Sequence, residues 1–284
     1  MASFTNQATL TYNGLVTNSN VASGELLEVL SAAKTAVIDN YAAGGTVTYI
    51  LSLVNAGTTA FNGLTVTDSL GEYTAENLTL YPLRYVDGSL RYYINGTLQT
   101  TAPTVTAGPP LTITGINVPA NGNVMLIYET AVTQFAPLSS ESTITNSAVI
   151  TGAGITPLTA SAIVTADPTP RLTISKSICP STVTENGQIT YTFILQNSGN
   201  TEATAADNAV VTDYFDPLLS NLSVTFNDAA WIEPTNYTYD TTTGLFSTVV
   251  GQITVPAATY TQDPTTGVWI TNPGVSILTV SGTV

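Results

Sequence analysis

Histidine is absent from this sequence, and cysteine occurs once, as Cys179. Without histidine there can be no Ser-His-Asp or Cys-His catalysis and no His-ligated metal site. A single cysteine forms neither a disulfide within the chain nor a zinc cluster. The sequence therefore predicts a protein that is not an enzyme and that needs no cofactor and no metal.

Basic side chains are scarce as well. Five Lys and Arg stand against 19 Asp and Glu, which gives a net charge of −14. A nucleic-acid interface or a polybasic membrane patch needs clustered Lys and Arg, so we expect neither partner. No apolar run reaches the roughly 18 residues of a membrane span.

The first residues, Met1-Ala2-Ser3-Phe4, lack the basic and apolar regions of a secretory signal, so no signal peptide is visible. Either a signal has been removed from the sequence or the protein leaves the cell by another route. Both routes are compatible with the residues present.

The sequence is rich in Thr, Val, Ala, Asn and Tyr, and its 284 residues are enough for two domains. Many short alternating segments with frequent turn residues and no helical period predict antiparallel β-sandwiches. Only 8% of residues are charged, so the surface must be largely Thr, Ser and Asn.

An internal repeat divides the chain. A strand that ends at Asn55-Ala56-Gly57 recurs as one that ends at Asn197-Ser198-Gly199. Later motifs recur in the same order: Val66-Thr67-Asp68 with Val211-Thr212-Asp213, and Val118-Pro119-Ala120 with Val255-Pro256-Ala257. Such self-similarity indicates two copies of one domain. We expect an N-terminal strand and linker over residues 1–25, a complete sandwich over 26–166 and a second sandwich over 167–284.

The second copy lacks the strand that closes the first. That closing strand, Ile144 to Thr151, instead resembles the N-terminal segment Phe4 to Thr11. An open sandwich exposes core and unpaired backbone, and strand addition from another chain can complete it. We therefore expect head-to-tail homopolymers, in which the donor strand inserts four residues: Phe4, Asn6, Ala8 and Leu10. Burial of its apolar groups could contribute on the order of 5 kcal/mol.

The groove that accepts the strand is expected along the last strand of the second sandwich, at Ile277, Val280 and Val284. Three alternatives compete with donation to a neighbour. The strand could fold back onto its own second domain, the sequence could be part of a longer array, or the N-terminus could be a disordered tail.

The motifs resemble the conserved-repeat family of Ig-like domains in bacterial surface proteins. The residues that carry the resemblance are Leu172-Thr173-Ile174-Ser175-Lys176, Thr190-Tyr191-Thr192, Asn197-Ser198-Gly199, Val211-Thr212-Asp213 and Thr145-Asn146-Ser147-Ala148-Val149. The resemblance covers most of both domains and implies two tandem Ig-like sandwiches with a structural role outside the cell, at a bacterial surface. A chain without an evident signal would also suit a fibre on a spore surface. The displaced closing strand departs from a simple stalk and suggests a pilus-like subunit.

The two lysines, Lys34 and Lys176, occupy the same position of the repeat. Strand alternation points Lys34, Asp68 and Asn146 inward, where an unpaired charge is costly. Burial lowers the pKa of a lysine and raises that of an aspartic acid, so the amine can attack the Asn carboxamide and ammonia can leave. The expected isopeptide bonds join Lys34 to Asn146 and Lys176 to Asn6 of the next subunit. The alternative is a partly buried Lys–Asp salt bridge with Asn hydrogen-bonded nearby.

In that scheme Asp68 assists the first bond and Asp213 the second. Cys179 is expected to fill a small core position.

A cluster of Tyr and Arg offers a different function, a surface module that binds glycan or host protein. Its members are Tyr81, Arg84, Tyr85, Arg91, Tyr92 and Tyr93. Such residues more often form cross-strand pairs on a sheet. The sequence therefore favours the structural filament subunit over the binding module.

Overall fold

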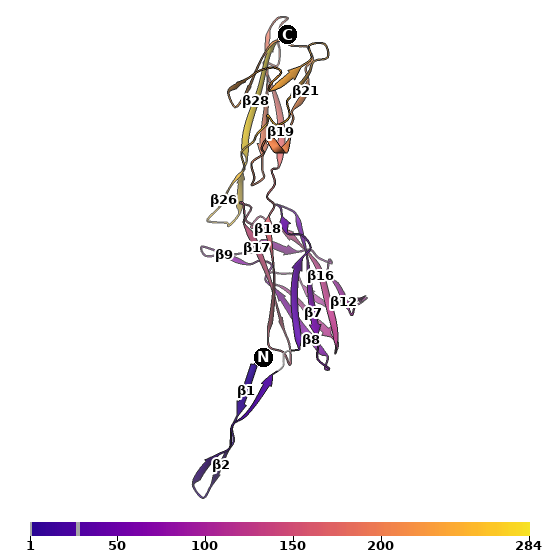
Figure 1. The fold of residues 1–284 in the computed structure, drawn as a ribbon, viewed down its shortest axis with the longest axis vertical. Coiled ribbons are helices and arrows are strands. Elements are labelled where there is room, and N and C mark those ends of the chain that lie inside the picture. Colours follow the sequence, from indigo (N-terminus) through magenta and orange to yellow (C-terminus); the bar gives the residue numbers. More distant parts are fainter. Residues whose placement is uncertain (1, 27–28) are drawn as a thin grey trace.

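A computed structural model of the chain describes residues 2–26 and 29–284, and the side chains of residues 1–4 and 25–28 lie outside the described part. The described residues form β-strands and one short 3-10 turn, η1 (Ala205–Asp207), and the expected all-β antiparallel fold is confirmed. Figure 1 shows an elongated molecule, in which an N-terminal hairpin is followed by domain 1 (residues 29–166) and domain 2 (residues 167–284). Among the described residues, no helix has the length and apolar character needed to cross a membrane.

Domain 1 is a sandwich of two sheets. The first sheet has the order β13 (Thr97–Leu98), β12 (Arg91–Ile94), β16 (Gly122–Val132), β7 (Thr46–Asn55), β5 (Leu30–Ala36), with β11 (Leu83–Tyr85) also on β16. The second has the order β14 (Thr104–Thr106), β15 (Leu111–Val118), β8 (Phe61–Asp68), β17 (Thr143–Thr151), β18 (Leu158–Ala166), β6 (Asn40–Tyr41). A small hairpin pairs β9 (Tyr73–Ala75) with β10 (Leu78–Leu80).

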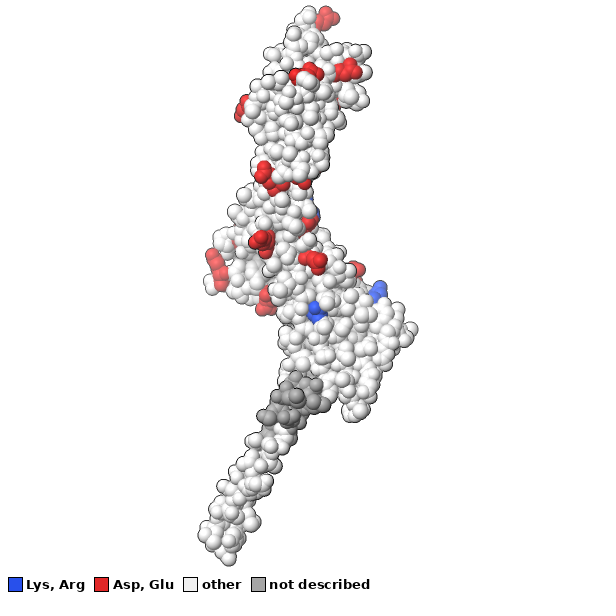
Figure 2. All heavy atoms as spheres, in the orientation of Figure 1, with Lys and Arg blue, Asp and Glu red and all other residues white. Residues whose placement is uncertain are grey.

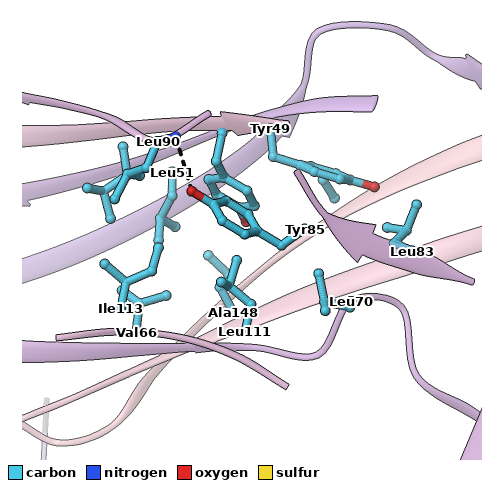
Figure 3. Packing of buried hydrophobic residues seen from close by; sticks show 14 of the residues in the cluster. Tyr49, Leu51, Val66, Leu70, Leu83, Tyr85, Leu90, Leu111, Ile113 and Ala148 are labelled. Carbon is cyan, nitrogen blue, oxygen red and sulfur yellow. Dashed lines mark hydrogen bonds between the residues drawn. The ribbon is translucent and has the colours of Figure 1, made fainter. Parts of the chain in front are cut away.

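Strand alternation builds the core between these sheets. Every second residue of β7 is buried, and Tyr49 and Leu51 on this strand are completely inaccessible. Figure 3 shows Tyr85 among these side chains, with its hydroxyl accepting a hydrogen bond of 3.2 Å from the backbone N–H of Leu90. Burying large apolar groups in this way is the main favourable contribution to folding.

Domain 2 repeats the first sheet with fewer strands opposite it. The larger sheet has the order β19 (Leu172–Cys179), β20 (Gln188–Asn197), β28 (Gly274–Thr283), β22 (Ser220–Phe226), β23 (Ala229–Trp231). The facing sheet has the order β21 (Thr212–Tyr214), β25 (Leu245–Thr248), β24 (Tyr237–Tyr239), and β26 (Thr259–Gln262) pairs with β27 (Trp269–Asn272). The buried apolar side chains form a separate cluster in each domain.

The repeated Asn residues have a structural role in both domains. Asn55 accepts a hydrogen bond from the Gly57 N–H and donates to the carbonyl of Pro119. Asn197 accepts from Gly199 N–H and donates to the carbonyl of Pro256. Each buried amide thus fastens a strand end to the repeated Val-Pro-Ala segment, which explains why these motifs recur together.

The N-terminal segment is a hairpin of two paired arms, instead of the single strand and linker expected over residues 1–25. One arm is formed by β1 (Ala2–Asn6) and β2 (Thr9–Tyr12), and the other by β3 (Leu15–Asn18) and β4 (Ala22–Leu26). Asn13 and Gly14 both have positive φ, as a tight two-residue hairpin turn requires. The sequence signal for this turn is the Asn-Gly pair itself.

Tyr73 joins the two domains. Its hydroxyl donates to the carbonyl of Phe135 in domain 1 and accepts from Gln262 Nε2 and Trp269 Nε1 in domain 2, at 2.9 and 3.2 Å. The backbone N–H of Trp269 donates to the Gln134 carbonyl at 3.0 Å. The β26–β27 hairpin is therefore fixed against domain 1 by several hydrogen bonds.

Candidate functional site

Lys34 and Asp68 form a buried ion pair inside domain 1. Lys34 lies on β5 of one sheet and Asp68 ends β8 of the other, and Nζ is 2.6 Å from Oδ2. Both side chains have no solvent exposure. Burial lowers the pKa of Lys34, and the Asp68 carboxylate offsets only part of that effect. Both sequence-predicted residues are therefore together, and the Lys34 ammonium gives up its proton more readily than that of an exposed lysine.

Asn146 lies on β17, and it is also completely buried. Its Oδ1 accepts hydrogen bonds from the Gly71 N–H at 3.2 Å and from the Ser69 hydroxyl at 3.3 Å. Among the described residues, no group accepts a hydrogen bond from its Nδ2. Two donors thus polarise the carboxamide carbonyl, while the amide nitrogen stays unpaired, at a cost of about 1–3 kcal/mol for a buried donor.

Two tyrosines enclose the site. The Tyr128 hydroxyl donates to Oδ2 of Asp68, and Lys34 Nζ lies 4.7 Å from the centroid of the Tyr49 ring. Burial raises the pKa of Tyr49, Asp68 adds to the effect, and the neighbouring Asn146 amide opposes it. Burial also raises the pKa of Tyr128, so this phenol stays a donor to the carboxylate. Tyr49 therefore adjoins the lysine and the asparagine alike.

Gly71, Ser69 and Tyr128 also belong to the site, although the sequence did not single them out. Gly71 has a φ of +73°, and a Cβ there would lie 2.5 Å from Cγ2 of Ile144. Only glycine can therefore bring its N–H against Asn146 without moving β17. A cavity of about 310 Å³ is lined by Gly71 and by Ile144 and Thr145 of β17. The sequence feature that could have pointed to these two donors is Ser69-Leu70-Gly71, which directly follows Asp68.

Domain 2 holds the corresponding pair, Lys176 and Asp213, but its described strands include no counterpart of β17 that would bring an asparagine to the pair. Lys176 Nζ forms an ion pair with Oδ2 of Asp213, and the side chains are 40% and 19% exposed. The ammonium lies 4.4 Å from the centroid of the Tyr191 ring. This site has the lysine and the acid of domain 1, but it is open to solvent.

The exposure follows from missing cover. In domain 1, β17 pairs with β8, and β18 packs beside β5. Within the described residues, domain 2 shows no counterpart of β17 or β18, so every residue of β19 is exposed. Ile174 and Ile178 on this strand are 55% and 43% exposed, and β21 has a free edge beside Asp213.

The expected acceptor edge on β28 is wrong. This strand pairs with β20 on one side and β22 on the other, so it has no free edge. Val280 is completely buried in the core, Ile277 lies on the opposite face, and Val284 is partly buried against the core. The prediction placed the gap next to the last strand, whereas two strands are missing on the other side of the sandwich, between β21 and β19.

The N-terminal hairpin projects from domain 1 at the end away from domain 2 (Figure 1). All residues from 5 to 23 are exposed, including Asn6, Ala8 and Leu10, and Leu10 is 61% exposed. The side chain of Phe4 lies outside the described residues. Figure 2 shows no charged atoms on the part of the hairpin drawn in white, and the sequence from Thr5 to Gly24 contains no charged side chain. Leu10, Leu15 and Val16 therefore leave large apolar groups uncovered on an isolated two-stranded hairpin.

The Tyr and Arg residues do not form one surface. Tyr85 and Tyr92 are buried in the core of domain 1, whereas Arg84 and Arg91 are exposed. The arginine side chain of Arg91 is turned back to the carbonyls of Gly88 and Leu90. Cys179 is exposed rather than in the core, because its strand is uncovered.

No protein-family model and no curated protein matches the chain. Several solved structures are similar to it at low identity. BcpA, the major pilin subunit of Bacillus cereus, has 12% identity and a TM-score of 0.35, with 95% of this chain and 73% of that chain covered.

The pilus backbone RrgB of Streptococcus pneumoniae has 9% identity and a TM-score of 0.33, with 86% of this chain and 56% of that chain covered. The collagen-binding subdomain of the Enterococcus faecalis surface protein ACE also has 9% identity and a TM-score of 0.33, with 50% of this chain and 99% of that chain covered. These are pilin subunits and an adhesin domain of bacterial surface proteins, the class that the sequence motifs resemble. The likenesses are too distant to carry an argument about function.

Proposed function

We propose that the chain is the subunit of a filament at a cell or spore surface, and that it polymerises head to tail. The N-terminal hairpin of one copy occupies the open side of domain 2 in the next. The observation that carries this proposal is that domain 2 lacks cover for β19 and β21, while an exposed hairpin with the matching motif stands at the opposite end of the molecule.

The hairpin matches the missing part in size. Domain 1 is completed by the antiparallel pair β17 and β18, and the hairpin is likewise an antiparallel pair of arms. Docking would place one arm on the free edge of β21 and the other beside β19, covering Ile174 and Ile178. The donor is therefore two strands rather than the single strand expected from the sequence.

A neighbouring copy is the partner that the geometry supports. Domain 1 lies between the hairpin and domain 2 of the same chain (Figure 1). A hairpin that folded back would have to pass the full length of domain 1. Each junction instead repeats the same contact, so the assembly is polar and open-ended.

Within domain 1 we propose that Lys34 and Asn146 form an isopeptide bond. The ammonium of Lys34 passes a proton to Asp68, and the neutral Nζ attacks Cγ of Asn146. The Gly71 N–H and the Ser69 hydroxyl stabilise the negative charge that develops on Oδ1. The Cγ–Nδ2 bond then breaks, Asp68 returns a proton to the departing nitrogen while it accepts the second amine proton, and one ammonia leaves. The reaction removes the buried charges of Lys34 and Asp68, and with Nδ2 of Asn146 it also removes the amide donor that had no acceptor.

Negative-stain electron microscopy of matched variants tests assembly. Leu10→Asp puts a charge on the face of the hairpin that corresponds to the buried Ile150 of β17. Thr5→Asp puts the same charge on the opposite face, which corresponds to the exposed Thr145. Both positions are exposed in the free subunit, so both variants should fold as the wild type does.

The proposal expects filaments from the wild type and from Thr5→Asp, and separate two-domain particles from Leu10→Asp. Particles of one subunit in the concentrated wild type would overturn it. Such single particles are what the wild type would give if its N-terminal hairpin covered domain 2 of the same chain.

A further inference from the structure

We infer that Lys176 is a cross-linking site that becomes complete only on assembly, where its Nζ bonds to Cγ of Asn6 from a second copy of the chain. The inference rests on the proposed function, because only a docked hairpin can bring Asn6 to domain 2. It adds a covalent bond at each junction, and its site is shared between two copies.

The pairing inside the hairpin places Asn6 correctly. Asn6 lies opposite Ala22 across β1 and β4, and Asn146 lies opposite Ala162 across β17 and β18. The two pairs span the same number of residues, so β1 and β4 have the register of the strands that close domain 1. This register holds over β1 and β4 in the free hairpin and shifts by one residue toward the tip, where Thr9 pairs with Asn18.

The edge of β21 then fixes where the hairpin lands. In domain 1, Ala148 of β17 pairs with Asp68 of β8. Ala8 follows Asn6 by two residues, as Ala148 follows Asn146. In the internal repeat, Asp213 corresponds to Asp68. Pairing Ala8 with Asp213 therefore puts Asn6 where Asn146 stands. A slip by one residue would turn Asn6 outward.

The acceptor side is preformed. Lys176 is already ion-paired with Asp213 and lies over the Tyr191 ring, just as Lys34 is paired with Asp68 and lies over Tyr49. What domain 2 lacks is burial: the Lys176 side chain is 40% exposed, whereas that of Lys34 is fully buried. A docked hairpin supplies the cover and the carboxamide in one step.

The reaction balances without any added reagent. Asp213 takes a proton from the Lys176 ammonium, and the free Nζ forms a C–N bond to Cγ of Asn6. The bond from Cγ to the amide nitrogen breaks. That nitrogen leaves as ammonia after Asp213 has returned the first proton to it and accepted a second proton from Nζ, which keeps its third proton as the N–H of the new amide. One amide replaces another, so nothing is oxidised or reduced.

The domain 2 site differs in ways that should slow it. In domain 1, Tyr128 pairs with Tyr49 across the sheet and donates a hydrogen bond to Asp68. In domain 2 the corresponding position opposite Tyr191 is Val280, which has no hydroxyl to donate to Asp213. Tyr214 replaces Ser69 directly after the acid. The junction bond should therefore form more slowly than the bond inside domain 1, and filaments should appear before they become covalent.

The experiment follows full-length protein through assembly by electron microscopy and by boiled SDS gels run with reducing agent, which excludes disulfides through Cys179. Asn6→Ala and Lys176→Ala are compared with Gln7→Ala and Arg171→Ala as matched controls. We expect the wild type and both controls to give filaments and then an SDS-resistant ladder. The cross-linked peptide should contain Lys176 and Asn6 and should be lighter by one ammonia.

Asn6→Ala should give filaments that dissolve to monomers in SDS, with loss of the whole ladder. Wild-type filaments that also dissolve to monomers would overturn the covalent bond and leave the proposed function standing. Absence of filaments in the wild type would overturn both.

Discussion

Lys34 Nζ lies 2.6 Å from Asp68 Oδ2 in a pair with no solvent exposure, and the pair joins the two sheets of domain 1. A buried pair of this kind rarely stabilises a fold by itself, because desolvation offsets the attraction. We propose a chemical use for the pair, because Asn146 on β17 presents a polarised carboxamide and an unpaired amide nitrogen.

The first prediction concerns Asn146→Ala. We expect the wild-type chain to be lighter than its sequence by one ammonia for domain 1, and the variant to have its full sequence mass. The bond closes a loop of on the order of 100 residues, so its loss should lower the free energy of unfolding by about 4 to 5 kcal/mol. Intact-mass spectrometry and urea denaturation measure the two effects.

Asn55→Ala is the control, because Asn55 is also a buried, hydrogen-bonded asparagine. This variant should lose stability but keep the mass deficit. A wild-type domain 1 at full sequence mass would contradict the bond.

The second prediction concerns Tyr128→Phe. The change removes the hydrogen bond to Asp68 but leaves the lysine, acid and amide in place. We expect the isopeptide bond to form several-fold more slowly after refolding from denaturant, because the acid is less firmly held. A time course of intact mass reports the rate.

Tyr92→Phe is its matched control. Tyr92 is a buried tyrosine whose hydroxyl donates to the Asn117 carbonyl, away from the site. Both variants should lose about 1 kcal/mol of stability. Equal rates of bond formation in the two variants would remove Tyr128 from the mechanism.

The third prediction is a difference in pH dependence. In Asn146→Ala the Lys34 amine stays free, and burial holds its pKa below the ordinary 10.5. Between the lowered pKa and 10.5, the unfolded chain binds more protons than the folded one, so stability rises with pH. In the cross-linked wild type this amine no longer titrates.

The stability gap between the wild type and this variant should therefore narrow as the pH rises toward 10.0. Above 10.0 the raised pKa values of Tyr49 and Tyr128 lower the stability of both proteins. Urea denaturation at a series of pH values measures the gap. Parallel curves would show that Lys34 is charged in the folded variant.

The fourth prediction concerns the joint between the domains. Tyr73→Phe removes the acceptor for Gln262 Nε2 and Trp269 Nε1, so both lose a partner. We expect faster amide hydrogen exchange at Trp269, and a loss of about 1–3 kcal/mol at the joint. Tyr214→Phe, at an exposed tyrosine, should leave exchange unchanged. Unchanged exchange in Tyr73→Phe would mean that other contacts hold the domains.

The sequence predicted the β-sandwich class, because Val, Ile and Tyr alternate with Thr and Ser through strands such as β7 and β20. It also predicted that Lys34, Asp68 and Asn146 point inward, since alternation fixes the face of each residue. It could not provide the distances, nor the donors Gly71 and Ser69, because these depend on how the chain turns after β8.

Two of the predictions that failed have a clear physical reason. The segment after Tyr12 was expected to be a polar link, yet Asn13-Gly14 makes a tight turn and this run is the second arm. Val280 was expected at the acceptor edge because it lies near the last residue of the sequence. Pairing on both sides of β28 put it in the core instead.

The most direct test of the central claim is electron microscopy of concentrated full-length protein beside Leu10→Asp. The account predicts thin wild-type filaments with a repeat of two domains, and single two-domain particles from the variant. Single particles from both proteins would contradict assembly through the hairpin, and filaments from both would show that assembly uses another surface.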